Sequence, residues 1–547
     1  MRKTLLGLFL CLMVGLALAH VTATGAESAA PAPAPAAAAT PSAPATAATP
    51  SGGVNPSDYP EIDDEELGQL RYALMIADQG PDDFRHLEGI DQLGMTSYRY
   101  ALAFMTYFLA LEQYYKLPAC PELIQPRMER LIRKMTRKPV WEFWAGVSRG
   151  VPVLEPGMNK PYPEEHDPVA HRNIMYSGHL GHMIGLYEML YHDYRWDQPA
   201  AIVFAWSAKE KYEYDHHSLV KVMYDQMVNN PWHGIECEPN AVFPECNQHP
   251  ILAFMLHDQQ HGTKFAAASA LFLDFFLQHK MIDPNSHQTA MLYLVKQDLT
   301  VANDSPRYRN AIDLVLAPAV SLGIVTLESS SANGWTGSFM HAWQPALIER
   351  HYPYQRARHL RESGESASLA KEYWEPNLNY GFFAMLAGEV GDDTTRDRLL
   401  RFADSRYLPE WSGGALRYPY NQSRKCTNLT GQLLAIVRAN PKDGLLTLHN
   451  RPFGEAHFAA PRLESLEFPR VALRRAVYDE GRRALVFTTE PGGARGGESK
   501  ARITQLDPAT SYRLLRDGRE VDAFQFLAER EVKVPLDGRH DFVLVAD

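Results

Sequence analysis

Residues 231–250 read Pro-Trp-His-Gly-Ile-Glu-Cys-Glu-Pro-Asn-Ala-Val-Phe-Pro-Glu-Cys-Asn-Gln-His-Pro, and the rest of the chain is interpreted around them. Pro231, Pro239 and Pro244 remove backbone donors and fix φ, so this stretch cannot form one continuous helix. Its two cysteines, Cys237 and Cys246, lie among carboxylates and amides, which are Glu236, Glu238, Asn240, Glu245 and Asn247. Long ordered loops in compact domains are usually functional. We therefore expect a rigid functional loop between helices, with the remaining chain as its scaffold.

The N-terminus indicates export. Arg2 and Lys3 precede the apolar segment 5–18, and Ala17-Leu18-Ala19 supplies small residues for cleavage, so residues 1–19 are typical of a secretory signal. About 14 apolar residues are too few to span a bilayer, which needs roughly 20. We expect a periplasmic or otherwise exported protein without a membrane span after cleavage. The net charge of −11, with no basic patch, argues against nucleic-acid binding.

Composition and periodicity divide the remaining chain into three parts. Residues 20–55 are Ala/Pro-rich and predict a disordered linker. Residues 56–455 form a helical domain, because apolar residues recur at helical spacing. The clearest helices are expected at 65–79, 98–115, 121–138, 171–193, 217–228, 263–279 and 288–298, with others in 305–349, 367–374, 379–389 and 394–404. About a dozen helices with long irregular loops favour a closed toroid over an α-solenoid, whose turns are usually short and uniform.

The period changes to two in the last part, residues 456–547, which predicts a small antiparallel β domain. Strands are expected at 471–478, 484–488, 512–515, 531–536 and 542–545. Asp517-Gly518 and Asp537-Gly538 are typical of hairpin turns.

The cysteine pair allows several interpretations. Disulfides are permissible in an exported protein, and free cysteines are often simply buried. Alternatively, two thiols face a cavity, where apolar surroundings raise a thiol's pKa and keep it protonated until a neighbouring base draws off the proton. One pair could then supply both an acid and a base.

Three further segments carry candidate side chains. Met175, His179, and His182 or Met183 fall on one face of the helix expected at 171–193. Two histidines at this spacing could bind a metal, but among 21 histidines such pairs also arise by chance. Around residues 88–100, Asp91 lies in a loop before Tyr98 and Tyr100, and the residues alone favour a helix cap for Asp91 and core packing for Tyr98. Trp335 belongs to an aromatic-rich segment that lines either a pocket or plain core.

With these residues in view, the chain resembles the linalool dehydratase/isomerase family. The matching stretches are Met175-Tyr-Ser-Gly-His179 and Gly234-Ile-Glu-Cys237-Glu-Pro-Asn-Ala-Val-Phe-Pro-Glu-Cys246-Asn, within roughly residues 60 to 440. The resemblance implies an (α/α)6 toroid with a central site, no cofactor and a ring-shaped homo-oligomer, a pentamer. It also implies dehydration and allylic isomerisation of tertiary allylic alcohols such as linalool-like monoterpenols or shorter alkenols.

Site residues follow from the same resemblance. Cys237, Cys246 and His179 are expected to be catalytic, while Asp91 and Tyr98 would reach the site of a neighbouring subunit. Substrate contacts are expected from Met175, Tyr100, Tyr308, Trp335 and Phe243. Dehydration needs an acid to protonate the leaving oxygen and a base to remove a carbon proton, each typically worth about 10²- to 10⁴-fold in rate. We expect Cys246 or Tyr98 to act at the oxygen and Cys237 at the carbon; covalent addition of a cysteine is the other route.

Three other functions fit the sequence less well. An exported polysaccharide lyase or glycoside hydrolase with a helical toroid and a β domain would use carboxylates of the 231–250 loop. A metal-dependent hydratase would use Cys237, Cys246 and His179 as zinc ligands. A non-catalytic scaffold would carry Cys237–Cys246 as a disulfide.

Overall fold

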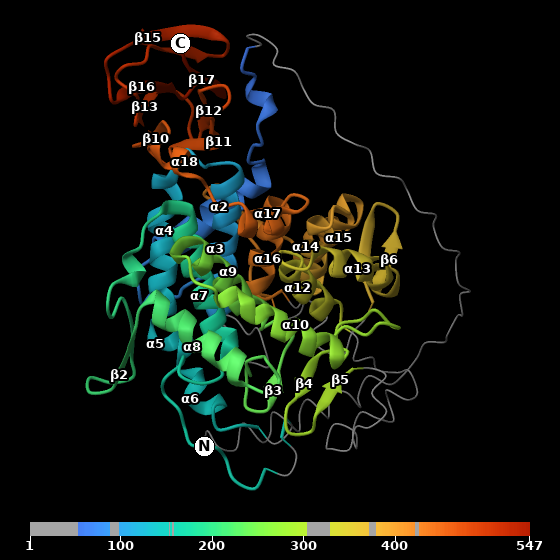
Figure 1. The fold of residues 1–547 in the computed structure, drawn as a ribbon. Helices are drawn as coiled ribbons and strands as arrows, with labels where there is room; N and C mark the ends of the chain where they lie inside the picture. The colour runs from blue at the N-terminus through green and yellow to red at the C-terminus, as the bar shows by residue number, and fades with distance from the viewer. Residues whose placement is uncertain are drawn as a thin grey trace.

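The computed structural model describes residues 53–87, 98–151, 154–155, 158–302, 329–370, 379–421 and 426–547. The fold is mostly helical and ends in antiparallel sheets, which lie at one end of the helices (Figure 1). Within the described ranges, none of the helices is long and apolar enough to cross a membrane.

The most deeply buried helices contact one another in a closed cycle. In the described part of the chain the cycle runs α3, α7, α9, α12, α14, α16 and back to α3. These helices span Tyr98–Tyr115, Ile174–Tyr191, Gln248–His261, Ser330–Met340, Asn379–Glu389 and Asn428–Ala439. Because α3, α7 and α12 are buried on nearly every face, their sequences are apolar all round rather than amphipathic.

Amphipathic helices surround this cycle. Helices α2, α4, α8, α13 and α15 contact its members, and α10 contacts α8. They span Asp64–Ala77, Pro121–Met135, His216–Asn229, Pro345–His359, Asp393–Tyr407 and Ala268–Gln278. The short helices are α5 (Lys138–Trp141), α6 (Phe143–Val147), α17 (Gly444–Asn450) and α18 (Glu455–Ala459), with 3-10 turns at Pro56–Asp58, Arg195–Asp197 and Phe265–Ala267.

Small residues set the close packing of α7 on α9. A Cβ added to Gly178 would lie 3.0 Å from Cδ of Pro250, and one added to Gly185 would lie 2.9 Å from Cβ of Leu256. Glycine lowers helix propensity by about 1 kcal/mol relative to alanine, and here it allows the two backbones to approach. This approach brings the first turns of α7 and α9 together at the site.

The 231–250 loop follows α8 and ends earlier than expected, because α9 begins at Gln248. Pro250 lies in the first turn of α9, where the backbone N–H that proline lacks would have no partner within the helix. The loop contains β3 (Ala241–Val242), which pairs with β4 (Leu292–Leu294), and β4 pairs with β5 (Leu299–Val301). The expected helix at 288–298 is therefore wrong. Its short apolar run is buried in the middle strand of a sheet, and periodicity cannot separate such a run from a helix.

Short hairpins connect several helices. They are β1 (Ile202–Ala205) with β2 (Lys211–Tyr214), β6 (Leu360–Ser363) with β7 (Ser366–Leu369), and β8 (Glu410–Ser412) with β9 (Ala415–Arg417). The helix expected at 367–374 begins instead as strand β7, which is held by cross-strand pairing with β6. Residues 371–374 of that segment, and residues 305–328 of the expected 305–349 region, lie outside the described residues.

The C-terminal strands form two antiparallel sheets, with orders β11-β12-β17-β14-β15 and β10-β13-β16. Their bounds are β10 Arg462–Glu464, β11 Val471–Asp479, β12 Ala484–Pro491, β13 Glu498–Thr504, β14 Tyr512–Arg516, β15 Arg519–Phe524, β16 Arg530–Pro535 and β17 His540–Ala546. All five expected strands are present. Asp517-Gly518 forms the β14–β15 hairpin with both residues at positive φ. Asp537-Gly538 instead carries the chain from β16 to β17 in the other sheet, so that hairpin prediction is wrong.

Backbone hydrogen bonds fix these sheets to the helices. The loop after α3 lies between β10 and β11, because Ala119 N donates to Ala476 O at 2.9 Å and Leu463 N donates to Ala119 O at 2.8 Å. Figure 1 places β3, and with it the cysteine loop, at the opposite end of the helices. The C-terminal sheets therefore brace the end of the helical domain that is far from the loop.

Candidate active site

The two thiols of the cysteine loop are buried, unoxidised and next to each other. Cys237 and Cys246 are 3% and 0% exposed, and neither forms a disulfide. Their side chains are close enough for each to shift the pKa of the other, and Cys246 Sγ lies 3.5 Å from Met175 Sδ. The disulfide scaffold considered from the sequence is therefore wrong for this structure.

One asparagine closes the loop that brings the thiols together. Asn247 accepts from Ile235 N at 2.8 Å and donates to Ile235 O and Phe243 O, both at 3.0 Å. A second set of bonds joins the loop to the start of α7, where Asn173 N donates to Cys237 O at 3.2 Å. Hydrogen bonds to the loop backbone, rather than regular secondary structure, therefore hold the two cysteines near each other.

Burial sets the protonation of both thiols, and hydrogen bonding makes them unequal. Burial raises the pKa of Cys237 to about 11, although hydrogen bonds from Cys246 and from the backbone N–H of Met175 lower it. Burial raises the pKa of Cys246 further above its usual range, and its bond to Cys237 adds to this rise. A thiol at a helix N-terminus is the easier one to ionise. Both are thiols at neutral pH, and Cys237 is the stronger acid.

The acidic residues of the loop differ in their partners. Glu236 forms an ion pair with Arg172 at 3.0 Å and so has a structural explanation. Burial raises the pKa of Glu245 to about 8 and also raises that of Glu238. Oε2 of each is buried without a hydrogen-bond partner among the described residues. Burial therefore favours the protonated form of both carboxyls, which lie close enough to affect the pKa of the thiols.

Four buried histidines lie close together in the same site, and three of them, His249, His182 and His449, form a hydrogen-bonded chain. Trp335 Nε1–H donates to His249 Nε2 at 2.9 Å, so the His249 proton is on Nδ1, 3.2 Å from His182 Nδ1. His182 Nε2 lies 2.7 Å from Nε2 of His449, whose Nδ1–H donates to Leu445 O at 2.7 Å. If each ring donates to the next, from His249 to His182 to His449, every hydrogen bond of the chain forms while all three rings stay neutral.

His179, the fourth histidine, has one nitrogen without a partner. Its Nδ1 lies 2.7 Å from the hydroxyl of Tyr107, and its ring centroid is 3.8 Å from that of His249. Its Nε2 is buried and has no hydrogen-bond partner among the described residues. Burial lowers the pKa of His179, His182 and His249 well below the usual value and that of His449 to about 4. His179 therefore offers a neutral nitrogen that a bound molecule can use.

Aromatic rings surround these polar groups. The Tyr100 ring meets those of His179 and Trp335 edge-on, with centroids 5.7 and 5.6 Å apart. The guanidinium of Arg99 lies 4.4 Å from the Tyr100 centroid and 3.4 Å from its hydroxyl. The candidate site is thus an apolar, aromatic environment containing a few uncharged polar atoms and one buried cation.

The structure gathers most, but not all, of the predicted site residues. Met175, His179, Cys237, Cys246, Tyr100 and Trp335 come together. Phe243 is half-buried on the same loop and packs against the apolar core. Tyr98 stacks on Phe84 of its own chain at 4.6 Å, and its expected role in a neighbouring subunit stays a prediction. Asp91 and Tyr308 lie outside the described residues.

Sequence reasoning missed Tyr107, His249 and His449. Tyr107 lies seven residues after Tyr100 on the same face of α3, a signal that was available but shared with ordinary core aromatics. His249 was hidden because its helix was taken as loop. His449 comes from α17, and only the three-dimensional structure brings it to His182.

The expected alternative of a metal site at the thiols is not supported. Among the described residues, the groups of side chains with ligand atoms within 4.8 Å of one another do not include Cys237, Cys246 and His179 together.

A cavity of about 760 Å³ lies nearby and is lined by residues that include Arg172, Trp232 and Glu236, but not by either cysteine.

Comparison with known families agrees with this site. A family model described as linalool dehydratase/isomerase matches residues 99–321 and 319–424, more than half of the chain. The matched region contains both thiols, His179 and the helices that hold them. The chain belongs to the linalool dehydratase/isomerase family, whose members are enzymes, and the resemblance drawn from the sequence is confirmed.

Solved structures share only a loose overall similarity. The α-1,6-mannanase of glycoside hydrolase family 76 from Salegentibacter sp. HEL1_6 is 10% identical, covers 71% of this chain and 100% of its own, and has a TM-score of 0.39. The β-L-arabinofuranosidase of family 127 from Geobacillus stearothermophilus T6 is 10% identical, covers 88% and 76%, and has a TM-score of 0.32. Similarity at these scores assigns neither fold nor function to this chain.

Proposed function

We propose that this protein dehydrates and isomerises tertiary allylic alcohols, linalool-like monoterpenols or shorter alkenols, without a cofactor. The observation that carries the proposal is the pair of buried, reduced thiols in the same site as an unpartnered histidine nitrogen. Apolar surroundings suit an isoprenoid chain and exclude stray water. Family membership supports the reaction class and suggests the substrate class, and the apolar surroundings of the site support the same choice.

The pair can act as a proton relay that returns to its starting state. Cys246 S–H gives its proton to the alcohol oxygen as the C–O bond breaks and water leaves. The Cys246 thiolate then takes the proton of Cys237, which is favourable because Cys237 is the stronger acid. The Cys237 thiolate removes the proton from the carbon adjacent to the allylic cation, and the alkene forms. Both sulfurs end as thiols, so one water and one alkene leave with no proton gained or lost.

Neighbouring residues make this transfer feasible. The backbone N–H of Met175 stabilises the transient Cys237 thiolate. His179 Nε2 holds the substrate oxygen, while Tyr107 fixes the ring from the other side. The rings of Tyr100 and Trp335 stabilise positive charge on the allyl group, worth about 0.5 to 2 kcal/mol per contact. Isomerisation follows when water returns to the other end of the allyl cation.

The wider assembly is part of the same proposal. We interpret the closed cycle of buried helices with its outer layer as the (α/α)6 toroid expected from the sequence. Asp91 and Tyr98 then contribute to a neighbouring subunit of a ring-shaped oligomer, a pentamer, and the protein acts in the periplasm after loss of residues 1–19. The role of Tyr98 at the substrate oxygen belongs to this assembled state.

Product formation from a panel of alcohols tests the function. Purified mature protein is incubated under reducing conditions with short and long tertiary allylic alcohols, their saturated analogues and primary allylic isomers, and alkenes are measured in the headspace. We expect alkenes from the tertiary allylic alcohols, isomerisation between tertiary and primary allylic forms, and none from the saturated analogues, which cannot form an allyl cation. Equal turnover of saturated alcohols, or none of any alkenol, would reject the proposal.

A further inference from the structure

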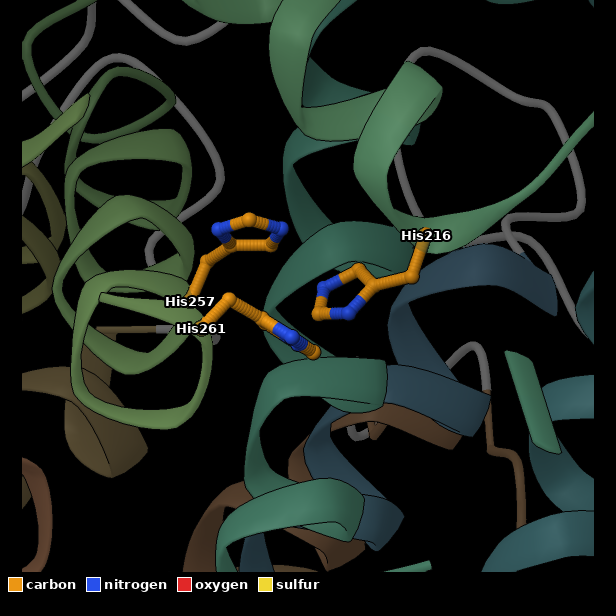
Figure 2. A group of neighbouring side chains, drawn as sticks. All are labelled: His216, His257 and His261. Atoms are coloured by element: carbon orange, nitrogen blue, oxygen red, sulfur yellow. The ribbon is translucent and has the colours of Figure 1, made fainter. Parts of the chain in front are cut away.

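A second cluster of histidines lies outside the candidate active site. His257 and His261 are four residues apart on α9, and their rings turn toward that of His216 at the start of α8 (Figure 2). Each of the three offers one ring nitrogen within 4.8 Å of the other two. Glu188, near the end of α7, and Asp197 lie beside them, and we call these five residues the histidine–carboxylate cluster.

Hydrogen bonds fix the tautomers of two of these rings. His216 Nδ1–H donates to Glu188 Oε2 at 2.8 Å, which leaves the lone pair on Nε2. The Thr263 hydroxyl donates to Asp258 at 2.5 Å, so it accepts from His257 Nδ1–H at 2.8 Å. The lone pair of His257 is therefore also on Nε2. A ligating imidazole is usually held in this way, with its other nitrogen bonded to an oxygen.

Both lone-pair nitrogens are buried and unused. His216 and His257 are each 0% exposed, and the Nε2 of each has no hydrogen-bond partner among the described residues. Protonation would not resolve this, since the new N–H would lack an acceptor as well. Buried polar atoms without partners cost roughly 1 to 3 kcal/mol each. A cation bound between the rings would satisfy them.

We propose that His216, His257 and His261 bind one zinc ion, with Glu188 orienting His216 and balancing the charge. Imidazole nitrogens are ligands that zinc prefers, at about 2.0 to 2.1 Å. His261 Nε2 lies 3.0 Å from Glu188 Oε2, so Nδ1 is the nitrogen of His261 that is left for the ion. His261 is partly exposed, so the site has an entry path. The ion would join the start of α8 to the C-terminal end of α9, and Glu188 would connect these residues to α7.

Metal analysis of the full mature chain, purified without a histidine tag, tests this site. After removal of metals with a chelator and addition of zinc, followed by desalting, we expect one zinc per chain and a thermal midpoint raised by at least about 2 °C. His216→Asn and His257→Asn keep a donor near the Nδ1 position and remove the ligating nitrogen, so each should lose both effects. His217→Asn, next to the cluster, and Cys246→Ala should retain them.

Two outcomes would overturn the site. The first is wild-type protein that retains no more zinc than His257→Asn, and the second is zinc retention that depends on Cys246 instead. If the asparagine variants fail to fold, cobalt substitution of wild-type protein decides the matter. Tetrahedral nitrogen ligation gives visible cobalt absorption, and its absence in folded, cobalt-loaded protein contradicts the proposal.

Discussion

The packed pair of helices α7 and α9 has a cluster of buried polar side chains at each end. The two clusters differ in the charge of their side chains. At their N-terminal ends lies the thiol–histidine centre, which is Cys237, Cys246, His179, His182, His249, His449 and Tyr107. At their C-terminal ends lies the histidine–carboxylate cluster, about 12 Å further along α9. In the described part of the thiol–histidine centre, no carboxylate is bonded to a histidine. Burial therefore lowers the pKa of the imidazoles and raises that of the thiols, and both kinds of group are neutral.

The second end contains an anion. Burial alone would raise the pKa of Glu188, but His216 and His261 hold it at about 2. The hydrogen bond to Glu188 in turn raises the pKa of His261. The comparison shows how one fold keeps reactive groups neutral in one place and charged in another. Neutrality suits proton transfer to an uncharged alcohol, and charge suits cation binding.

The largest expected effect is the response of stability to acid. The four histidines of the thiol–histidine centre have folded-state pKa values below the unfolded value of 6.5, so below pH 6.5 the unfolded chain binds protons that the folded chain does not. Their contribution is present above pH 6.5 and is lost on acidification, by about 1.4 kcal/mol per pH unit for each, or about 5 kcal/mol per unit together. Urea unfolding between pH 7 and pH 5 measures this slope.

Single variants assign the acid response to its source. His182→Gln should reduce the slope by about 1.4 kcal/mol per pH unit. His540→Gln, in the C-terminal sheets, should not reduce it, because Asp517 and Asp537 raise the pKa of His540 against the effect of burial. An unchanged slope in His182→Gln would mean that the histidine chain is not neutral in the folded state.

The next effect is on catalysis. Cys246→Ala removes the proton donor and should lower kcat by about 10²- to 10⁴-fold, equivalent to roughly 3 to 5.5 kcal/mol. Cys120→Ala is the matched control, because Cys120 is another buried thiol whose pKa burial raises to about 12. It should retain turnover. Circular dichroism checks that both variants fold, and near-normal alkene formation by Cys246→Ala would rule out the relay.

Removing the anion of the other cluster tests stability rather than activity. Glu188→Ala leaves two histidines without their carboxylate and should cost about 3 kcal/mol in urea unfolding at pH 7 with chelator present. Glu455→Ala removes a carboxylate 3.8 Å from His192 that is 90% exposed, and should change stability little. Equal effects of the two variants would contradict the contrast drawn here.

The smallest effect concerns the support of His179. Tyr107→Phe removes the hydroxyl bonded to His179 Nδ1 and should lower kcat about fivefold to tenfold, the equivalent of one ordinary hydrogen bond. Tyr115→Phe removes a hydroxyl on the same helix that binds Gly444 O at 2.8 Å, and should leave kcat unchanged. Steady-state kinetics on the best alkenol separates the two variants.

Sequence periodicity predicted the long helices well, because α3, α4, α7 and α8 have apolar residues spaced for burial over several turns. It failed for β4, whose short apolar run has no period of its own. It also missed the whole of α9, whose first turn lies in the proline-containing stretch that was interpreted as a loop. In the C-terminal sheets, β11 and β12 were found from their alternation. Strands β13 and β15, with several exposed charged residues, were not.

The candidate site was predictable in its thiols and in the Met175–His179 face of α7, since these lie close in sequence or on one helix. It was not predictable where contacts are long-range. The His182–His449 contact joins residues 267 positions apart, and no local pattern indicates it. The Asn247 hydrogen bonds that close the loop depend on a backbone path that only the folded chain defines.

The central claim is that Cys237 and Cys246 work as a reduced pair, and one titration tests it directly. Native protein is treated with a mild disulfide-forming oxidant, and free thiols, the Cys237–Cys246 linkage by peptide mass and alkene formation are followed together. Turnover should fall in proportion to the fraction of linked pairs and return when a reductant restores both thiols. Full turnover by protein whose Cys237 and Cys246 are joined would contradict the account.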